Sequence, residues 1–383
     1  MLKIAHALIL AGLLGCPAFS LAADPPAKPK PVIPAFDDVL EAWGLTLNGY
    51  LDTSYNLRSG NGLFTSGVST RVFDNDRNSF SVQQAAFVLA KQPKEGFGGL
   101  LNLTAGKDAD VIGAFGSGSN TDNFDVTQAF AQYATGPFTV IGGKYVTLAG
   151  AEVINSTANT IFSRSILFGY AIPFTHTGVR GTYAVNDKLS LIGGLNNGWD
   201  NLRDTNSAKT VELGVSYAPL KNLSLTAQSY IGRERLCGST CNTGPEGQRF
   251  LIDLVGTYNA TDKLTLVLNF DYARQSNATT ATPTATGNAK WQGVAGYATY
   301  QINDKWRTTL RGEYFDDKDG YRTVVAQKWK EVTLDLSYLA HKNFELRTDL
   351  RFDRSSVASF VDANGVTAGK NQVSLGFDAL FKF

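Results

Sequence analysis

The sequence lacks any long hydrophobic run, and this absence limits how the chain can meet a membrane. Beyond residue 23, no stretch approaches the roughly 18 consecutive apolar residues that identify a transmembrane helix. Charged residues make up only 18% of the chain, below the roughly 25% that is usual for soluble domains. With 35 Lys and Arg against 34 Asp and Glu, the net charge is +1, so no basic face indicates nucleic-acid binding.

Histidine is also scarce, which limits the chemistry that the chain can perform. Beyond residue 23 the only histidines are His176 and His341, and neither lies beside the nucleophile motif that general-base hydrolysis needs. No cluster has metal-ligand spacing, and no glycine loop is of the phosphate-binding kind. We therefore expect neither an enzyme nor a metal or other cofactor.

The first 23 residues have the pattern of an export signal. Lys3 supplies a positive start, residues 4–14 form an apolar stretch, and small residues at 20–23 suit cleavage. The apolar stretch is shorter than the roughly 20 residues with which a helix spans a membrane. Residues 1–23 are thus predicted to be a signal peptide rather than an anchor, and a lipoprotein attached at Cys16 is the second alternative.

Two further features follow from export. Cys237 and Cys241 are the remaining cysteines, and their close spacing predicts a small disulfide ring in an exported chain. Residues 24–34 are rich in proline, which favours a stiff, extended spacer, and residues 35–43 place apolar side chains at helical spacing. We interpret 24–43 as a proline-rich periplasmic linker that ends in a short amphipathic segment.

Strict alternation of apolar and polar residues runs from residue 44 to the last residue. The clearest stretch begins at Phe344, where one face carries five charged side chains, namely Glu345, Arg347, Asp349, Arg351 and Asp353. Burying unpaired charges in a dry core is expensive, so this face must meet water or partner charges while the other face is apolar. The pattern predicts strands with one wet face and one apolar face.

The alternation divides the chain into sixteen strands. We place them at 45–56, 78–91, 97–107, 123–134, 137–146, 174–185, 189–199, 208–218, 223–234, 248–258, 263–275, 290–301, 305–315, 328–339, 344–354 and 371–383. Each is long enough to cross a bilayer at a tilt, and an even number puts both ends on the periplasmic side. The predicted fold class is all-β, a closed antiparallel transmembrane β-barrel of about 16 strands over residues 44–383.

The connectors between these strands alternate in length. The short ones follow five tyrosines, which are Tyr183, Tyr217, Tyr258, Tyr300 and Tyr338. The long ones are rich in Gly, Ser, Thr, Asn and Asp. Short periplasmic turns, long external loops and an aromatic girdle are typical of outer-membrane barrels. A propeller is the rival interpretation for units of about 40 residues, but its blades bury apolar side chains on both faces.

Several short motifs occur in an order and spacing that resemble one known family. They are Gly143-Lys144-Tyr145, Gly150-Ala151-Glu152, Ser163-Arg164-Ser165, the stretch from Pro173 to Arg180, Asn197-Gly198-Trp199 and Gly232-Arg233-Glu234. Over about residues 45–383 the chain resembles the OmpL-like β-barrel porin family. The resemblance implies an integral protein of the Gram-negative outer membrane, in contact with lipid and lipopolysaccharide. The C-terminal strand, which finishes in an aromatic residue, resembles the signal read by barrel-assembly machinery.

Sixteen strands leave room for an aqueous channel, and no plug domain precedes the predicted barrel. The longest connector, Thr147–Pro173, is expected to fold into the lumen as the third loop of porins does, and an outward-facing loop is the alternative. Six charged residues on this loop or on the predicted lumenal face form the candidate constriction, namely Lys144, Glu152, Arg164, Arg180, Arg311 and Glu313. For each of them, plain cross-strand pairing on a wet wall is the alternative.

The predicted function is a porin, a water-filled channel for passive diffusion of small hydrophilic solutes or ions. The alternative is a structural or adhesive outer-membrane barrel that uses its external loops, and a barrel hydrolase is less favoured. A homo-oligomer is compatible with the sequence, which selects no particular number of subunits.

Overall fold

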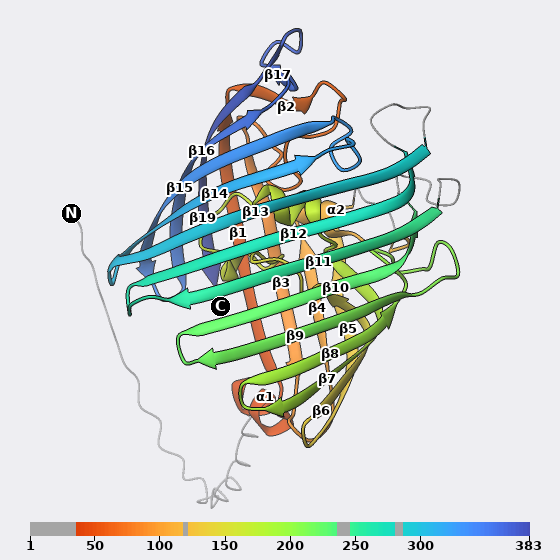
Figure 1. Ribbon diagram of the computed structural model, residues 1–383. Helices are drawn as coiled ribbons and strands as arrows, with labels where there is room; N and C mark the ends of the chain where they lie inside the picture. Colours follow the sequence, from red (N-terminus) through yellow and green to blue (C-terminus); the bar gives the residue numbers. More distant parts are fainter. Residues whose placement is uncertain (1–35, 118–121, 236–245, 280–285) are drawn as a thin grey trace, which may run out of the picture.

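The structure is a computed structural model that describes residues 36–117, 122–235, 246–279 and 286–383 (Figure 1). Cys237 and Cys241 lie outside these residues, as does the predicted signal peptide. The described residues form strands for the most part, with the short helices α1 (Phe36–Trp43) and α2 (Lys107–Ile112). None of the helices formed by these residues is long and apolar enough to cross a membrane.

Sixteen strands close into one antiparallel barrel, as the alternation predicts. They are β1 (Thr46–Arg58), β3 (Phe80–Lys91), β4 (Gly96–Ala105), β5 (Phe124–Thr135), β6 (Phe138–Val146), β7 (Thr175–Asn186), β8 (Leu189–Asn196), β9 (Thr210–Leu220), β10 (Leu223–Arg235), β11 (Glu246–Asn259), β12 (Leu264–Thr279), β13 (Thr286–Asn303), β14 (Trp306–Asp317), β15 (Gln327–His341), β16 (Phe344–Ser355) and β19 (Asn371–Lys382). Each strand pairs with its neighbours in sequence, and β1 closes the barrel against β19. The predicted boundaries differ most at β12 and β13, which extend further into their shared loop.

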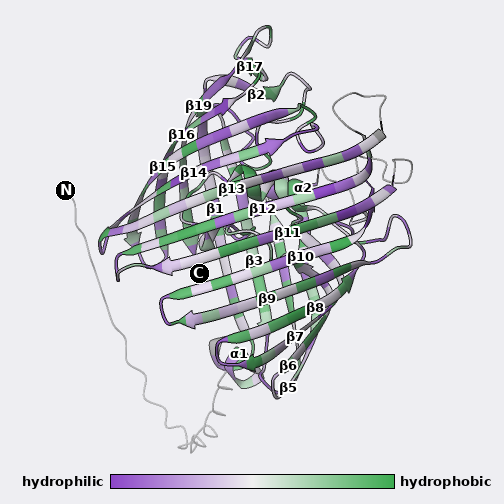
Figure 2. Ribbon diagram, in the orientation of Figure 1, coloured by the Kyte–Doolittle hydropathy of each residue, from purple (hydrophilic) through white to green (hydrophobic). Residues whose placement is uncertain are grey.

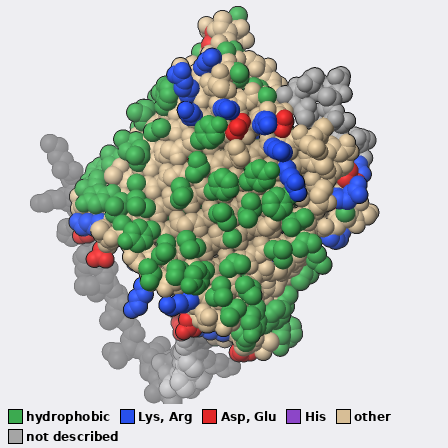
Figure 3. Space-filling model, viewed as in Figure 1, with side chains coloured by type: hydrophobic (Ala, Val, Ile, Leu, Met, Phe, Trp, Pro, Cys, Tyr) green, Lys and Arg blue, Asp and Glu red, His purple; other side chains and the backbone are tan. Residues whose placement is uncertain are grey.

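The two faces of each strand differ as the alternation requires, and Figure 2 shows the hydropathy alternating along the strands. On β16 the five predicted charged residues are all buried inside the barrel. Leu346, Leu350 and Phe352, which alternate with them, are 41%, 54% and 43% exposed on the outer face. Apolar side chains accordingly spread over the outer wall in Figure 3. The charged face of this strand points into the lumen, as predicted.

The short turns lie at one end of the barrel, together with the start of β1 and the end of β19. Four of the five predicted girdle tyrosines are exposed beside these turns, and the fifth, Tyr338, packs its ring 4.8 Å from that of Trp306. At the seam, the ring of Phe383 lies against Gly49, where a Cβ would come within 2.2 Å of it. A side chain at Gly49 would therefore displace the last residue of the chain.

Three further strands lie outside the barrel, where the sequence predicted only loops. They are β2 (Gly60–Phe64), β17 (Phe360–Asp362) and β18 (Ala368–Gly369), which form a small antiparallel sheet in the order β18, β17, β2. The sheet joins the first long connector to the last, at the end of the barrel opposite the short turns (Figure 1). These strands are short and rich in turn residues, so their pairing depends on contacts between distant parts of the chain.

The lumen contains a packed apolar cluster in addition to its polar wall. Its largest members come from both the wall and the long connectors, and include Phe64, Phe73, Ile161, Phe168, Trp291, Phe315 and Trp329. The sequence predicted a wet bore, but apolar side chains from both the wall and the connectors fill part of it. The interior is therefore narrower than strand number alone indicates.

Candidate constriction site

The connector Thr147–Pro173, here called the inward loop, folds into the lumen. It leaves β6 at Val146 and returns to β7 at Thr175, and these two residues are direct partners in the β6–β7 register. Between them the chain forms a 3₁₀ turn, η1 (Ser156–Ala158), and a π-helical turn, η2 (Leu167–Ala171). The sequence expectation of an inward-folded loop agrees with this placement.

The base of the inward loop rests on a tyrosine of β10. The Tyr230 hydroxyl lies 3.0 Å from the hydroxyl of Thr147 and accepts a hydrogen bond from the backbone N–H of Leu148 at 3.3 Å. It also donates to Glu212 Oε1 at 3.3 Å. On the other side of its ring, His176 stacks with the two ring centres 4.4 Å apart. The base is thus held by the hydrogen bonds of one buried aromatic residue.

The far part of the loop reaches the opposite wall and contacts β16. Arg347 Nη1 donates to the backbone oxygens of Ser156 and Asn159, at 3.2 and 2.8 Å. Arg351 Nη1 donates to the backbone oxygen of Arg164 at 2.7 Å. Because these acceptors are backbone atoms, the two wall arginines hold the path of the loop rather than particular side chains.

Arg311 of β14 is the central contact between loop and wall. Its Nη1 lies 2.7 Å from Glu152 Oε1 and donates to the backbone oxygen of Ser163 at 2.6 Å. Its Nε lies 3.2 Å from Glu313 and 3.1 Å from Glu331. Arg311 itself is fully buried. One guanidinium is therefore shared by carboxylates from the loop and from two strands.

The two candidate glutamates bind the backbone of the loop as well. Glu313 accepts hydrogen bonds from the backbone N–H groups of Ile166 and Leu167, at 3.1 and 3.2 Å. Glu152 accepts one from the backbone N–H of Ser165 at 2.7 Å. Both carboxylates thus fix the turn that leads into η2.

A glycine makes this loop geometry possible. Gly150 has φ +96°, a left-handed conformation that residues with a Cβ rarely adopt. A Cβ at this position would also lie 2.7 Å from Ile172 Cδ1. Gly150 therefore permits the close approach of the two ends of the loop just before Glu152.

Arg164 lies on the loop as predicted, but its guanidinium binds within the loop. It donates to the backbone oxygens of Phe162 and Ile154, at 3.0 and 3.1 Å, and to the hydroxyl of Ser156 at 3.2 Å. The guanidinium also lies over the ring of Phe73, 5.6 Å from its centre. Arg164 is buried, so in this structure it stabilises the loop from within.

Lys144 and Arg180 lie apart from the other four candidates, on β6 and β7. Lys144 Nζ lies 2.9 Å from Asp125 Oδ1, and both residues are buried. Arg180 lies 2.8 Å from Glu212, and its guanidinium packs 4.2 Å from the centre of the Tyr145 ring. The structure therefore brings Glu152, Arg311 and Glu313 together and leaves these two residues in separate pairs near the base of the loop.

The strands β14, β15 and β16, here called the charged wall, carry their charges in rows across the strands. One row is basic and runs through Arg311, Thr333, Arg351, Ser374 and Arg58. The next is acidic and runs through Glu313, Glu331 and Asp353. Like charges that face each other across strands repel, so the attraction must come from the neighbouring row. The Arg351–Asp353 pair, at 2.8 Å along one strand, is an example.

Other connectors also enter the lumen. Asp108 of α2 accepts a hydrogen bond from Gln84 Nε2 at 2.7 Å, and the same amide nitrogen donates to the loop oxygen of Ile154 at 2.9 Å. Burial raises the pKa of Asp108 to about 7, although the nearby Arg164 guanidinium opposes the shift. These contacts could not be predicted from the sequence, because Asp108 lies in a polar connector with the composition of an external loop.

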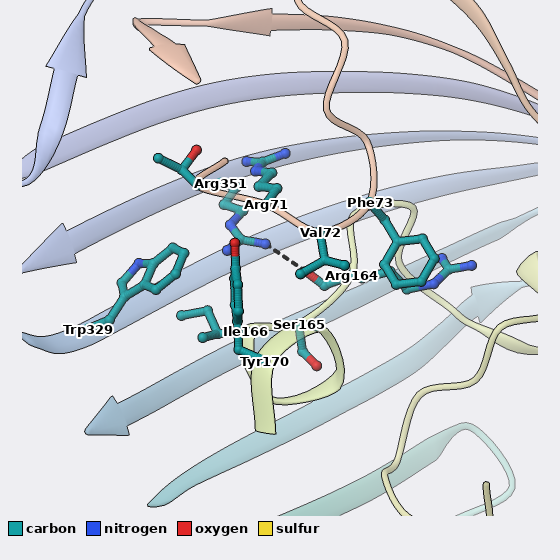
Figure 4. A pocket seen from close by; sticks show the side chains of 11 residues that line it. Arg71, Val72, Phe73, Arg164, Ser165, Ile166, Tyr170, Trp329 and Arg351 are labelled. Atoms are coloured by element: carbon teal, nitrogen blue, oxygen red, sulfur yellow. Dashed lines mark hydrogen bonds between the residues drawn. The ribbon is translucent and has the colours of Figure 1, made fainter. Parts of the chain in front are cut away.

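The segment after β2 packs against the inward loop and the charged wall around a small cavity (Figure 4). Arg71 of this segment forms buried ion-pair contacts with Asp74 and, more distantly, with Asp353. The cavity also borders Tyr170 and Trp329 and has a volume of about 10 Å³. A cavity of this size holds about one water molecule. The segment after β2, the inward loop and the charged wall are thus closely packed around this cavity.

A pair of acidic residues on β11 and β12 was also missed. Asp253 and Asp271 face each other directly in the β11–β12 register, and both are fully buried. Asp253 accepts a hydrogen bond from Asn269 at 2.6 Å. The alternation of the sequence indicates that both side chains point into the lumen, but it does not predict that they face each other. Within the residues that the structure describes, no group of acidic, histidine or cysteine residues could hold a metal ion.

Comparisons with known proteins agree with this architecture. The model of a family described as "Putative beta-barrel porin-2, OmpL-like" matches residues 44–383. A search of curated proteins finds no significant match.

Similar solved structures include the anion-selective porin from Comamonas acidovorans, with TM-score 0.61, 14% identity, and coverage of 88% of this chain and 99% of that one. The outer-membrane channel DcaP of Acinetobacter baumannii has TM-score 0.58 and 14% identity, with 88% and 97% covered. The trimer form of OmpT from Vibrio cholerae has TM-score 0.60 and 11% identity, with 88% and 99% covered. At these identities the likeness shows the fold alone.

Proposed function

Because the chain belongs to the OmpL-like β-barrel porin family and has a porin-like outer-membrane channel fold, we propose that it passes small hydrophilic solutes or ions by passive diffusion. The inward loop is the proposed constriction of this channel. After removal of the predicted signal peptide, the barrel lies in the outer membrane, in contact with lipid and lipopolysaccharide.

The observation that carries this proposal is the charged wall facing the inward loop inside a closed barrel. A structural barrel needs no such wall, because apolar packing would fill its interior at lower cost than buried ion pairs. Charged and polar groups that line a bore set which ions or solutes enter it. The close filling around the loop favours small solutes over large ones.

A homo-oligomer is a second part of the proposal. The likeness to OmpT of Vibrio cholerae, a structure of which is described as a trimer form, supports it. Mass measurement of the purified protein in detergent tests the number of subunits.

The decisive experiment shortens the inward loop and measures conductance in planar bilayers. Val146 and Thr175 are register partners, and the Thr147 N–H donates to the Phe174 backbone oxygen at 2.9 Å, so a tight turn can join the two strands. Replacing residues 148–173 by Asn-Gly, a turn that suits antiparallel strands, should leave the barrel closed. We expect a several-fold larger single-channel conductance than in the wild type.

The matched control shortens an external loop that does not enter the lumen. Replacing residues 363–366, between β17 and β18, should leave conductance unchanged. A shortened-loop variant that migrates as a folded barrel yet gives no conductance steps would contradict the channel and favour the structural or adhesive alternative. Equal conductance in the wild type and the shortened-loop variant would instead remove the inward loop from the constriction.

A further inference from the structure

Two arginines at the loop end of the lumen are not neutralised by ion pairs. Arg249, at the start of β11, donates to Gln275 at 2.8 Å and to the Tyr321 hydroxyl at 3.0 Å. Arg322, in the connector after β14, donates through Nε to the backbone oxygen of Tyr170 at 2.5 Å. Among the described residues, neither guanidinium has a carboxylate within ion-pair distance, unlike the arginines of the charged wall.

The two guanidiniums contact the same aromatic residue. Their central carbons are 4.6 Å (Arg249) and 5.7 Å (Arg322) from the ring centre of Trp199. Trp291 packs edge-on against Trp199 at 6.2 Å and stacks on Tyr321 at 5.5 Å. Burial, and after it the charge of Arg249, lowers the pKa of Arg322. Two cationic side chains thus pack against one tryptophan, and the charge of one acts on the pKa of the other.

Three acidic residues lie in the neighbourhood, but each is already bound to backbone N–H groups. Asp317 accepts from the N–H groups of Tyr321, Arg322 and Thr323, at 2.7 to 3.0 Å. This carboxylate therefore shapes the connector that presents Arg322.

The other two carboxylates are used in the same way. Asp200 accepts from the N–H groups of Phe174 and Thr175, at 2.8 and 2.9 Å. Glu234 accepts from the N–H of Trp199 at 3.3 Å and from the hydroxyl of Thr210 at 2.6 Å. All three acids thus build the scaffold of the cluster, and the outer nitrogens of Arg322 form no hydrogen bond with any of the described residues.

An independent observation also indicates a missing acceptor. Trp199 is only 6% exposed, and its buried indole nitrogen has no hydrogen-bond partner among the described residues. A buried donor without an acceptor is costly, so such groups usually mark a bound water or ligand. Arg322 is half-buried and so keeps contact with solvent. The residue that both guanidiniums contact thus carries a further donor that has no acceptor among the described residues.

We propose that Arg249, Arg322 and Trp199 form a binding site for the carboxylate or phosphate group of an anionic solute, at the external end of the lumen. Guanidinium groups bind such oxyanions through paired, charge-assisted hydrogen bonds. The site adjoins η2, since Trp291 Nε1 donates to the backbone oxygen of Ala171 at 2.9 Å. The role of this site in solute passage rests on the proposed channel function. Binding of the anion can be measured without conduction.

The test is calorimetric titration of the full chain, refolded in detergent, at constant ionic strength. Succinate and inorganic phosphate are the anionic probes, and succinamide is the neutral analogue of succinate. We expect saturable binding of succinate or phosphate but not of succinamide. Arg322→Gln should weaken that binding at least about tenfold, the effect of losing roughly one charge-assisted hydrogen bond. Trp199→Phe, which keeps the ring and removes the N–H, should weaken it less.

Arg233→Gln is the matched control, because Arg233 is an exposed arginine at the same end of the barrel that pairs with Glu246. It should leave binding unchanged. Arg322→Lys, which keeps the charge, should bind more tightly than Arg322→Gln and supplies a second variant if the glutamine variant does not fold.

Three outcomes would overturn the site. They are failure of both anions to bind, equal binding of succinamide, and equal losses of affinity in Arg322→Gln and Arg233→Gln. Binding without conductance would retain the site and refute the channel, and conductance without binding would do the reverse.

Discussion

The far part and the base of the inward loop are held by different kinds of interaction. On the charged wall, Arg311, Arg347 and Arg351 bind loop carboxylates and backbone oxygens. On β10, Tyr230 holds the base of the loop through hydrogen bonds of a neutral hydroxyl. Charge therefore fixes the far part of the loop, whereas the base is fixed by its chain connections and one aromatic residue. Changes in charge should consequently loosen the far part first.

The largest difference should appear when the central contact of the charged wall is removed. Arg311→Ala leaves Glu152, Glu313 and Glu331 buried without their shared cation. Breaking a buried ion pair in this way costs about 3–5 kcal/mol. We expect a loss of this size in the free energy of unfolding, measured by urea titration in lipid vesicles, together with greater protease sensitivity of the inward loop.

The control for this variant is Arg233→Ala, which removes an exposed ion pair with Glu246. Such pairs contribute about 0–1 kcal/mol, so this change should have little effect. If both alanine variants lose similar stability, the charged wall does not hold the loop as described.

A pH titration examines a third contact, where α2 meets the loop through Gln84. Because burial raises the pKa of Asp108 to about 7, the folded protein keeps this proton up to higher pH than the unfolded chain, whose pKa is about 4. Stability should therefore fall as pH rises from about 4 to about 7, by up to about 4 kcal/mol. Asp108→Asn should remove that part of the pH dependence, as measured by unfolding at about pH 4.5 and about pH 8, near the two ends of this range. A slope equal to that of the wild type would contradict the buried carboxyl.

The smallest effect is expected at the base of the loop. Tyr230→Phe removes the hydroxyl bonded to Thr147 and Leu148 but keeps the ring that stacks on His176. The loss of neutral hydrogen bonds costs about 0.5–1.5 kcal/mol. Unfolding measurements should show a loss in this range, and one as large as that of Arg311→Ala would remove the contrast between the far part and the base of the loop.

The sequence predicted the wall of the barrel well, because the alternation of apolar and polar residues along a strand indicates directly which side chains point inward. Arg347 and Asp349 could thus be assigned to the lumen from their alternation with Leu346 and Leu350, and the structure buries both. Membership of the candidate constriction was harder to predict. The period gives the direction of a side chain but not its place around the barrel, so Lys144 and Arg180 were grouped with residues of the far wall.

Contacts between connectors could not be predicted at all. Asp108 and Arg71 lie in polar segments that have the composition of external loops, and their burial depends on other segments that fold over them. Trp199 was noticed only as part of a motif, since its contact with Arg322 joins two separate connectors. Pairings over such sequence distances leave no local periodicity. The assignment of Cys237 and Cys241 to a disulfide stays a prediction.

The small sheet outside the barrel has a consequence for the order of folding. Its strand β2 follows the first barrel strand, whereas β17 and β18 precede the last one. The register of Phe64 with Phe360 can therefore form only when the two termini of the barrel have met. An intermediate with an open seam would lack this sheet, so protection of residues 360–362 from hydrogen exchange should report the moment at which closure is complete.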